Sequence, residues 1–215
     1  ANGAFDATGG NVTFTGAGNL QLQGTVTSLG TLTDATHGTV TYDDPTAGDQ
    51  GIVADDYVNL IVGGGAGTKT LAGTVVVAAA FTTDASVTTI MGANALTVTG
   101  ATDINGTVTM TTGVLNADGT FDATGGNVTF TGAGSLLLAG AVTSLGTLTD
   151  ATHGTVTFDG PGDQNIVADD YVNLIAGGGA GTKTLAGAVV VAGDFTTIAS
   201  VTTAMGVNNL TVAGA

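Results

Sequence analysis

The stretch DDYVNLIVGGGAGTKTLAG (residues 55–73) joins one run of aliphatic and β-branched residues to another through a block of glycines. Valine, isoleucine and threonine favour strands, whereas glycine favours sharp turns between strands. The same stretch returns at residues 169–187, with Ala176 in place of Val62. A strand–corner–strand segment that occurs twice in one chain indicates a fold built by stacking similar units.

The glycine block GGGAGTKT (63–70) comes close to a phosphate-binding loop, which has the form G-x-x-x-x-G-K-[ST]. Thr68 stands where that motif has its second glycine, and strand-like residues follow where a helix is needed. The block therefore predicts a corner between strands, with Lys69 reaching an outer face, and no nucleotide site. Lys69 and Lys183 are the two cations of the chain. We expect them to pair with an aspartate between coils or subunits.

Long internal repeats extend this pattern over the chain. Residues 5–18 return unchanged at 121–134, an offset of 121 − 5 = 116 residues. Residues 26–41 return unchanged at 142–157 with the same offset. We therefore treat the chain as two sequence units.

The two units differ in length at one segment. DDPTAGDQ (43–50) is shortened to DGPGDQ (159–164), which reduces the later offset to 169 − 55 = 114 residues. A surface loop tolerates such a change, because in a core strand it would shift the register. We assign 1-116 to the first unit and 117-215 to a second, incomplete unit continuous with it. The incomplete second unit suggests excision from a longer array, or completion of the ends by a neighbouring subunit.

Composition excludes several classes of function. The chain has two Lys+Arg, seventeen Asp+Glu and a net charge of −15. Such a chain cannot neutralise a phosphate backbone, so we expect no nucleic-acid partner. It has no cysteine, which excludes disulfides and zinc–thiolate sites. No apolar run approaches the ~18 residues of a membrane span, so we expect no membrane insertion.

Short strand-type runs recur with a period near twenty residues. They begin near Val12, Leu32, Ile52, Val75 and Leu96, and apolar residues alternate with polar ones, mostly threonine. This alternation predicts strands with one buried and one exposed face. We predict an all-β chain: a parallel β-solenoid (β-helix) with about twenty-residue coils and about six coils per unit. Tandem Ig-like β-sandwiches are the alternative, since a unit has the ~100 residues of such a domain.

One segment supports a family resemblance. YVNLIVGGGAGTKTLAGTVVVAAAFTT (57–83), followed by ALTVTG (95–100), resembles the repeats of large bacterial and archaeal cell-surface β-solenoid proteins. These include filamentous-haemagglutinin-like adhesins and autotransporter-like passengers. The resemblance implies an extracellular or cell-surface structural rod that associates head-to-tail with copies of itself or with further repeats. The stalk of a large adhesin is the alternative.

Aspartate clusters are the candidate metal ligands. Short carboxylates on a loop bind Ca²⁺ when backbone carbonyls complete the shell, although aspartate beside glycine or proline is also ordinary turn chemistry. Calcium is therefore the one cofactor that we consider. The candidate ligands are Asp43, Asp44, Asp49, Asp55, Asp56, Asp159, Asp163, Asp169 and Asp170.

No catalytic set is recognisable, so we predict that the chain is not an enzyme. His37 and His153 precede glycine in a turn-like segment, and Ser28 and Ser144 lie in strand-edge contexts. Pairs of threonines in Thr-x-Thr segments, such as those at 107–109, are typical of ice-binding solenoids. Their uneven intervals along the sequence argue against a regular face. Exposed threonines are also possible sites of O-linked glycans.

Overall fold

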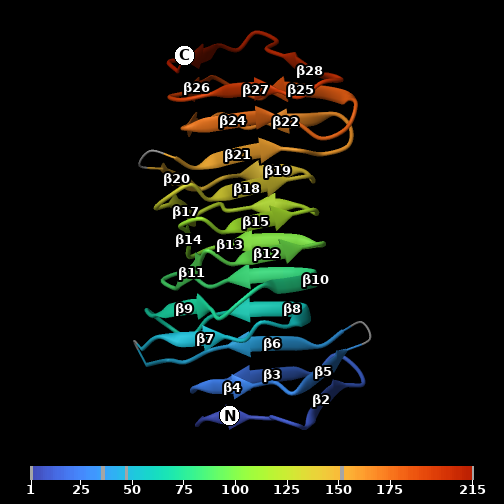
Figure 1. Cartoon of the computed structure of the whole chain (residues 1–215), viewed down its shortest axis with the longest axis vertical. Helices are drawn as coiled ribbons and strands as arrows, with labels where there is room; N and C mark the ends of the chain where they lie inside the picture. Colours follow the sequence, from blue (N-terminus) through green and yellow to red (C-terminus); the bar gives the residue numbers. More distant parts are fainter. Residues whose placement is uncertain (1, 35–36, 47, 151–152, 215) are drawn as a thin grey trace.

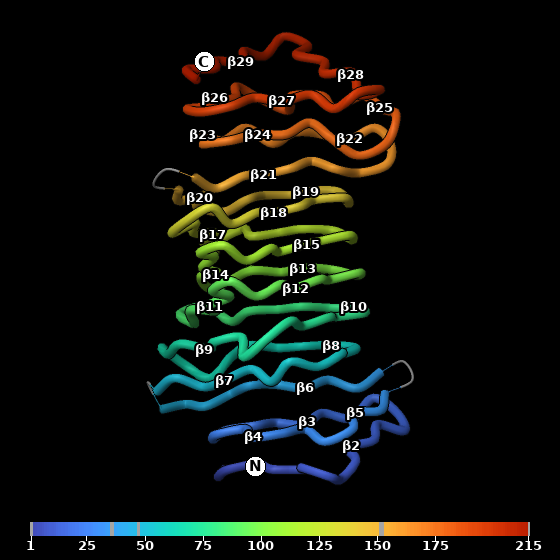
Figure 2. Tube along the Cα trace, viewed as in Figure 1, coloured from blue at the N-terminus to red at the C-terminus, as the bar shows by residue number. Residues whose placement is uncertain are grey.

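The structure is a computed structural model that describes residues 2–34, 37–46, 48–150 and 153–214. It is a parallel β-solenoid of about 10 turns with a spacing of roughly 20 residues, and the described residues contain no helix. Figures 1 and 2 show a rod with the two termini at opposite ends. The solenoid prediction is therefore confirmed, and the sandwich alternative is wrong. No described helix is long and apolar enough to cross a membrane.

Each turn has three sides, and the strands of each side stack on those of the turns before and after. Most neighbours on one side are paired in parallel, while β4 and β7, β5 and β8, and β20 and β23 lie in contact without pairing. The first side comprises β1 (Phe5–Asp6), β4 (Val26–Ser28), β7 (Gln50–Ile52), β9 (Thr68–Leu71), β11 (Thr88–Gly92), β14 (Thr107–Met110), β17 (Asn127–Phe130), β20 (Thr147–Asp150), β23 (Asp170–Tyr171), β26 (Val189–Val191) and β29 (Leu210–Val212).

The second and third sides share two long strands that run around a corner. The second side comprises β2 (Asn11–Phe14), β5 (Thr31–Asp34), the starts of β8 (Asp56–Val62) and β10 (Val75–Thr83), β12 (Ala95–Val98), β15 (Val114–Ala117), β18 (Ser135–Leu138), β21 (Thr155–Phe158), β24 (Asn173–Ala176) and β27 (Phe195–Thr197). The third comprises β3 (Asn19–Leu22), β6 (Thr39–Tyr42), the ends of β8 and β10, β13 (Ala101–Ile104), β16 (Phe121–Asp122), β19 (Val142–Ser144), β22 (Gln164–Ile166), β25 (Gly181–Leu185) and β28 (Val201–Ala204).

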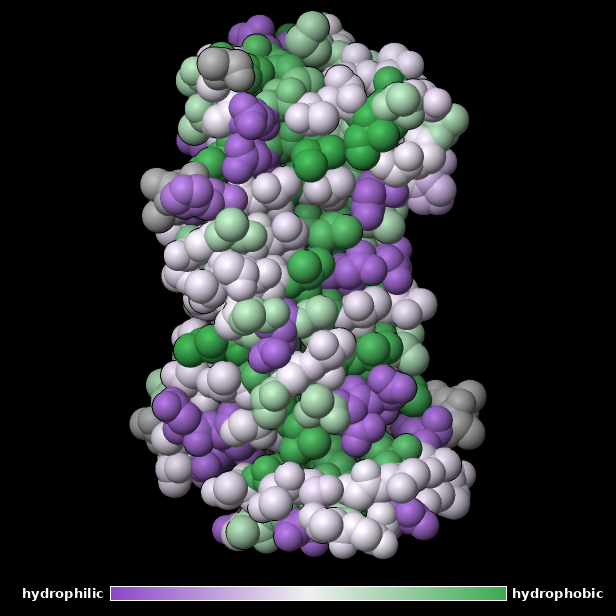
Figure 3. Space-filling model, viewed as in Figure 1, coloured by the Kyte–Doolittle hydropathy of each residue, from purple (hydrophilic) through white to green (hydrophobic). Residues whose placement is uncertain are grey.

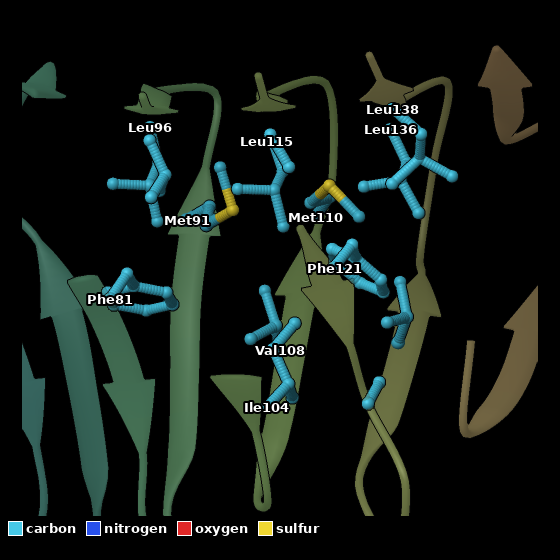
Figure 4. Close-up of a cluster of buried hydrophobic side chains, with 14 of the residues drawn as sticks. Phe81, Met91, Leu96, Ile104, Val108, Met110, Leu115, Phe121, Leu136 and Leu138 are labelled. Atoms are coloured by element: carbon cyan, nitrogen blue, oxygen red, sulfur yellow. The ribbon is translucent and has the colours of Figure 1, made fainter. Parts of the chain in front are cut away.

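Apolar side chains from all three sides fill the inside of the rod. Leu96, Leu115 and Leu136 are in register on successive turns and are fully buried. Phe81 and Met110 pack in the same interior, as Figure 4 shows. Because like residues stack on like residues, one turn has a core pattern that the next can continue.

The glycine block forms the predicted corner between β8 and β9. Gly64 and Gly65 have φ values of 94° and 86°, a region that side-chain-bearing residues rarely adopt. The corner prediction is confirmed for residues 63–67, whereas Thr68–Thr70 of the block already belong to the strand β9. The expected outer position of Lys69 is wrong, because its side chain is fully buried. The amphipathic alternation of β9 turns Lys69 and Leu71 inward.

The sequence unit does not contain a whole number of turns. Phe5 lies on the first side of the first turn, whereas its counterpart Phe121 lies on the third side of the sixth. One unit therefore advances by five full turns and two further sides. In the same way, Gln50 lies on the first side and its counterpart Gln164 on the third. Identical segments thus occupy different sides of the rod.

Candidate functional site

The corner after β6 is held by two buried polar side chains. Gln50 and Lys69 are in register on β7 and β9. Gln50 Nε2 donates to the carbonyls of Leu22 at 2.9 Å and Gly24 at 2.7 Å, both in the previous turn. Lys69 Nζ donates to the carbonyl of Asp44 at 3.2 Å. We call each such in-register glutamine and lysine a polar clamp, because together they connect three successive turns.

The second unit repeats the polar clamp with more hydrogen bonds from the lysine. Lys183 Nζ donates to the carbonyls of Gly160 at 2.7 Å and Gly162 at 2.9 Å. Gln164 Nε2 donates to Leu138 and Gly140 carbonyls at 2.7 and 2.8 Å. Both lysines thus donate to main-chain carbonyls, where we expected an aspartate carboxylate as the partner. The carbonyl belongs to Asp44 for Lys69, and the carbonyls belong to glycines for Lys183.

Burial and nearby carboxylates shift the pKa of the two clamp lysines in opposite directions. Desolvation lowers the pKa of Lys69 and Lys183, because removal from water disfavours the ammonium form. Nearby carboxylates oppose this shift, with Asp44 the main one for Lys69 and Asp159 for Lys183. Each lysine of the clamp thus donates to buried carbonyls, while the nearby carboxylates favour its charged form.

Asp43 and Asp44 of the loop in the first unit accept hydrogen bonds from other protein groups. Asp43 Oδ2 accepts from Gln21 Nε2, and from Gln23 Nε2 at 3.2 Å. Asp44 Oδ1 accepts from the Thr46 amide at 2.9 Å and the Thr46 hydroxyl at 2.6 Å, which lowers its pKa. This is an Asx-type turn, a structural role. Ala47, one of the two residues missing from the second unit, lies outside the described residues.

Asp49 lies on the same loop, and Asp159 and Asp163 lie on the corresponding loop of the second unit. Asp49 is exposed at the end of its loop, and Asp163 Oδ1 accepts from the Thr182 amide at 2.8 Å. Asp159 is half-buried, and its Oδ1 is buried without a hydrogen-bond partner among the described residues. Burial raises its pKa.

Two aspartate pairs, Asp55 with Asp56 and Asp169 with Asp170, lie at the next corner along each turn. Asp55 Oδ1 accepts from the Asp56 amide, and Asp169 Oδ1 accepts from the Asp170 amide, each at 2.8 Å. Burial raises the pKa of Asp55 and of Asp169. Within the described residues, no three carboxylate or histidine groups lie in an arrangement that could hold a metal ion. Calcium binding stays a prediction, and a melting temperature that does not respond to a chelator would contradict it.

The histidine and serine candidates have turn geometry. The His37 amide donates to Asp34 Oδ1 at 3.1 Å, and the His153 amide to Asp150 Oδ1 at 3.2 Å. The hydroxyl of Ser28 accepts from the Gly30 amide at 3.0 Å, and Ser144 makes the same contact. These contacts cap turns, as expected for serine and aspartate beside glycine.

A buried tyrosine pair was not foreseen from the sequence. The hydroxyls of Tyr42 and Tyr57 lie 3.0 Å apart. The Val53 amide donates to Tyr42 Oη at 3.0 Å, and Tyr57 Oη donates to the Val53 carbonyl at 2.6 Å. In the second unit Phe158 replaces Tyr42, while Tyr171 keeps its bond to the Val167 carbonyl. The sequence signal that could have pointed to this pair is the replacement of Tyr42 by Phe158 between the otherwise identical segments TVTY (39–42) and TVTF (155–158).

The comparisons with known proteins add no relative. The chain matches no protein-family model, and no curated protein or solved structure is significantly similar to it.

Proposed function

We propose that this chain is a structural protein of the cell surface or extracellular matrix, and that its solenoid forms or belongs to a filament. The observation that carries the proposal is the stack of parallel strands around one apolar interior, in which a 13-stranded sheet runs from β3 to β27. In such a stack each turn is stabilised mainly by its two neighbours, so turns add along one axis. The product is a stiff rod whose function is mechanical.

Burial at equivalent positions shows what an added turn contributes. Met91 and Val98 are fully buried beneath the following turn. Their counterparts Met205 and Val212, in the last described turn, are 51% and 42% exposed. A further turn of the same kind, from a second copy or from further repeats, would bury them.

Charge supports axial growth over lateral clumping. With a net charge of −15, parallel rods repel one another along their lengths. Figure 3 shows the hydrophilic residues of one face in separate groups along the whole height of the rod. End-to-end contact brings fewer of these charges together than side-by-side contact. We therefore expect salt to promote bundling more than end-to-end growth.

Electron microscopy of the isolated chain tests the proposal. Filaments with a rise of about 50 Å per chain are expected, from about 10 turns at ~4.8 Å each. Val212→Asp places a charge at the end of the rod and should leave short rods, whereas Thr196→Asp on an outer face should not. Discrete single rods under all conditions would favour the alternative, the stalk of a cell-surface adhesin. Glycans on threonine stay a prediction for mass measurement of the native protein.

A further inference from the structure

One side of the rod carries two straight rows of threonine. The six-stranded sheet β7–β9–β11–β14–β17–β20 lies on the first side, and its labels follow the left side of the rod in Figure 1. The outward positions of β9, β11, β14, β17 and β20 are in register from turn to turn. The first row is Thr68, Thr88, Thr107, Asn127 and Thr147, and the second is Thr70, Ile90, Thr109, Thr129 and Thr149.

We call these ten positions the threonine grid; eight of them are threonine. The residues between the two rows point inward, and those from Lys69 to Val128 are buried, so the grid faces solvent. Strands in a sheet lie ~4.8 Å apart, and alternate residues along a strand lie about 6.6 Å apart. The one register shift within these strands falls after Ile90, outside the grid. The side chains therefore form a regular two-dimensional lattice.

The threonine grid carries no charge, although the chain has seventeen aspartates. The nearest one in these strands is Asp150, at the end of β20 and beyond both rows. Each threonine presents a methyl group beside a hydroxyl that both donates and accepts. Asn127 Nδ2 donates to Thr107 Oγ1 at 3.2 Å, so the one amide is tied into its row. The surface combines apolar and hydrogen-bonding groups at fixed spacings.

Uneven intervals along the sequence do not prevent this regularity. Corners take up different numbers of residues, so Thr70, Thr109 and Thr149 align although 39 and 40 residues separate them (109 − 70 and 149 − 109). Other Thr-x-Thr segments lie on other sides of the rod. The segments 13–15 and 31–33 are examples, because Thr13 and Thr33 are register partners on the second side. The uneven intervals therefore do not argue against a regular face on this side.

We propose that the threonine grid binds ice. Its two spacings are close to repeat distances between oxygen positions in hexagonal ice. Methyl groups order neighbouring water while hydroxyls hydrogen-bond to it, and no charge holds liquid-like water against the surface. A crystalline polysaccharide is the other regular ligand, but the grid has no aromatic side chain on which sugar rings could stack. This proposal is independent of filament formation.

Freezing-point measurements on the whole chain test ice binding. The wild type should show a gap between melting and freezing points, shape ice crystals into facets and slow their recrystallisation. Thr129→Tyr adds bulk in the middle of the second row and should abolish the gap, while tyrosine keeps the strand favourable. The matched control is Thr157→Tyr, since Thr129 lies in Asn-Val-Thr-Phe and Thr157 in Thr-Val-Thr-Phe on the second side. The control should keep the full gap.

A second variant guards against misfolding as the cause of a loss. Ile90→Thr with Asn127→Thr completes both rows and should widen the freezing gap. The proposal is overturned if the folded wild type shows no gap and no inhibition of recrystallisation. It is equally overturned if Thr129→Tyr and Thr157→Tyr reduce the gap alike. Pelleting with microcrystalline cellulose or chitin, without any effect on ice, would assign the grid to a polysaccharide instead.

Discussion

Replacing Lys183 by methionine tests the energetic role of the polar clamp. Methionine keeps most of the apolar length of the side chain but removes the ammonium group. The carbonyls of Gly160 and Gly162 then lose donors at 2.7 and 2.9 Å. A hydrogen bond to a charged group contributes roughly 1.5–3 kcal/mol, and an unpaired buried carbonyl costs about 1–3 kcal/mol. Relief from burying a charge offsets part of this loss.

We therefore expect Lys183→Met to destabilise the chain by about 2–4 kcal/mol. Lys69 makes one hydrogen bond, of 3.2 Å, so Lys69→Met should cost less, about 1–2 kcal/mol. Thermal unfolding followed by circular dichroism measures the difference. At about 2–4 °C per kcal/mol for a chain of this size, Lys183→Met should lower the melting temperature by about 4–16 °C.

Hydrogen exchange locates the effect, because turns of a solenoid can open separately. Protection should fall around the carbonyls that Lys183 holds and remain unchanged in distant turns. Thr184→Met introduces the same side chain at the adjacent, half-buried outer position, and should change stability by less than about 0.5 kcal/mol. A Lys183→Met chain as stable as the wild type, or equal losses for both lysine variants, would refute the reasoning.

Three further predictions concern other parts of the rod. Tyr57→Phe should cost about 1–2 kcal/mol in denaturant unfolding, because it removes the donor to the Val53 carbonyl and the acceptor of the Tyr42 hydroxyl; a neutral result would contradict the hydrogen-bond network. Gly119→Ala should prevent native stacking, since its Cβ would lie 2.0 Å from the Gly100 carbonyl oxygen, whereas Gly51→Ala meets nothing within 4 Å. Burial raises the pKa of Asp169, so the folded chain holds that proton more tightly than the unfolded chain. Stability from this group is full below the ordinary pKa of 3.8 and lost as pH rises through the folded value. Mild acidification should therefore raise the melting temperature, and Asp169→Asn should weaken that response.

Periodicity and glycine placement were sufficient to predict the solenoid. Strand starts near Val12, Leu32 and Leu96 lie within one residue of the strands β2, β5 and β12. These signals are local, since they depend on alternation within a strand and on turn chemistry between strands. Strands such as β9 and β13 were not foreseen, because their inward residues include lysine and threonine. Polar inward residues interrupt the pattern on which the prediction depends.

The polar clamp could not be predicted for a related reason. A single lysine after a glycine corner is expected to reach solvent, because burying an ammonium group is costly. The buried Lys69 ammonium donates a hydrogen bond to a carbonyl in the neighbouring loop, and that contact joins residues 25 positions apart. The position of the loop depends on register between turns. Register is a property of the stack, and the local sequence around Lys69 does not contain it.

One sequence unit is not a whole number of turns, and this mismatch shows which features of the sequence the fold requires. The segment NVTF forms β2 on the second side at residues 11–14 and β17 on the first side at 127–130. One segment can serve two sides only if the sides have similar strand lengths and similar inward space. The fold then requires the alternation of apolar and polar residues in each strand and a suitable length of each corner. A given segment can form a strand on any side that meets these two requirements. The threonine grid is a consequence of this freedom, because it combines strands from the end of the first unit with strands from the start of the second. A function that belongs to one side of the rod therefore belongs to neither unit alone, and removing either unit should abolish it.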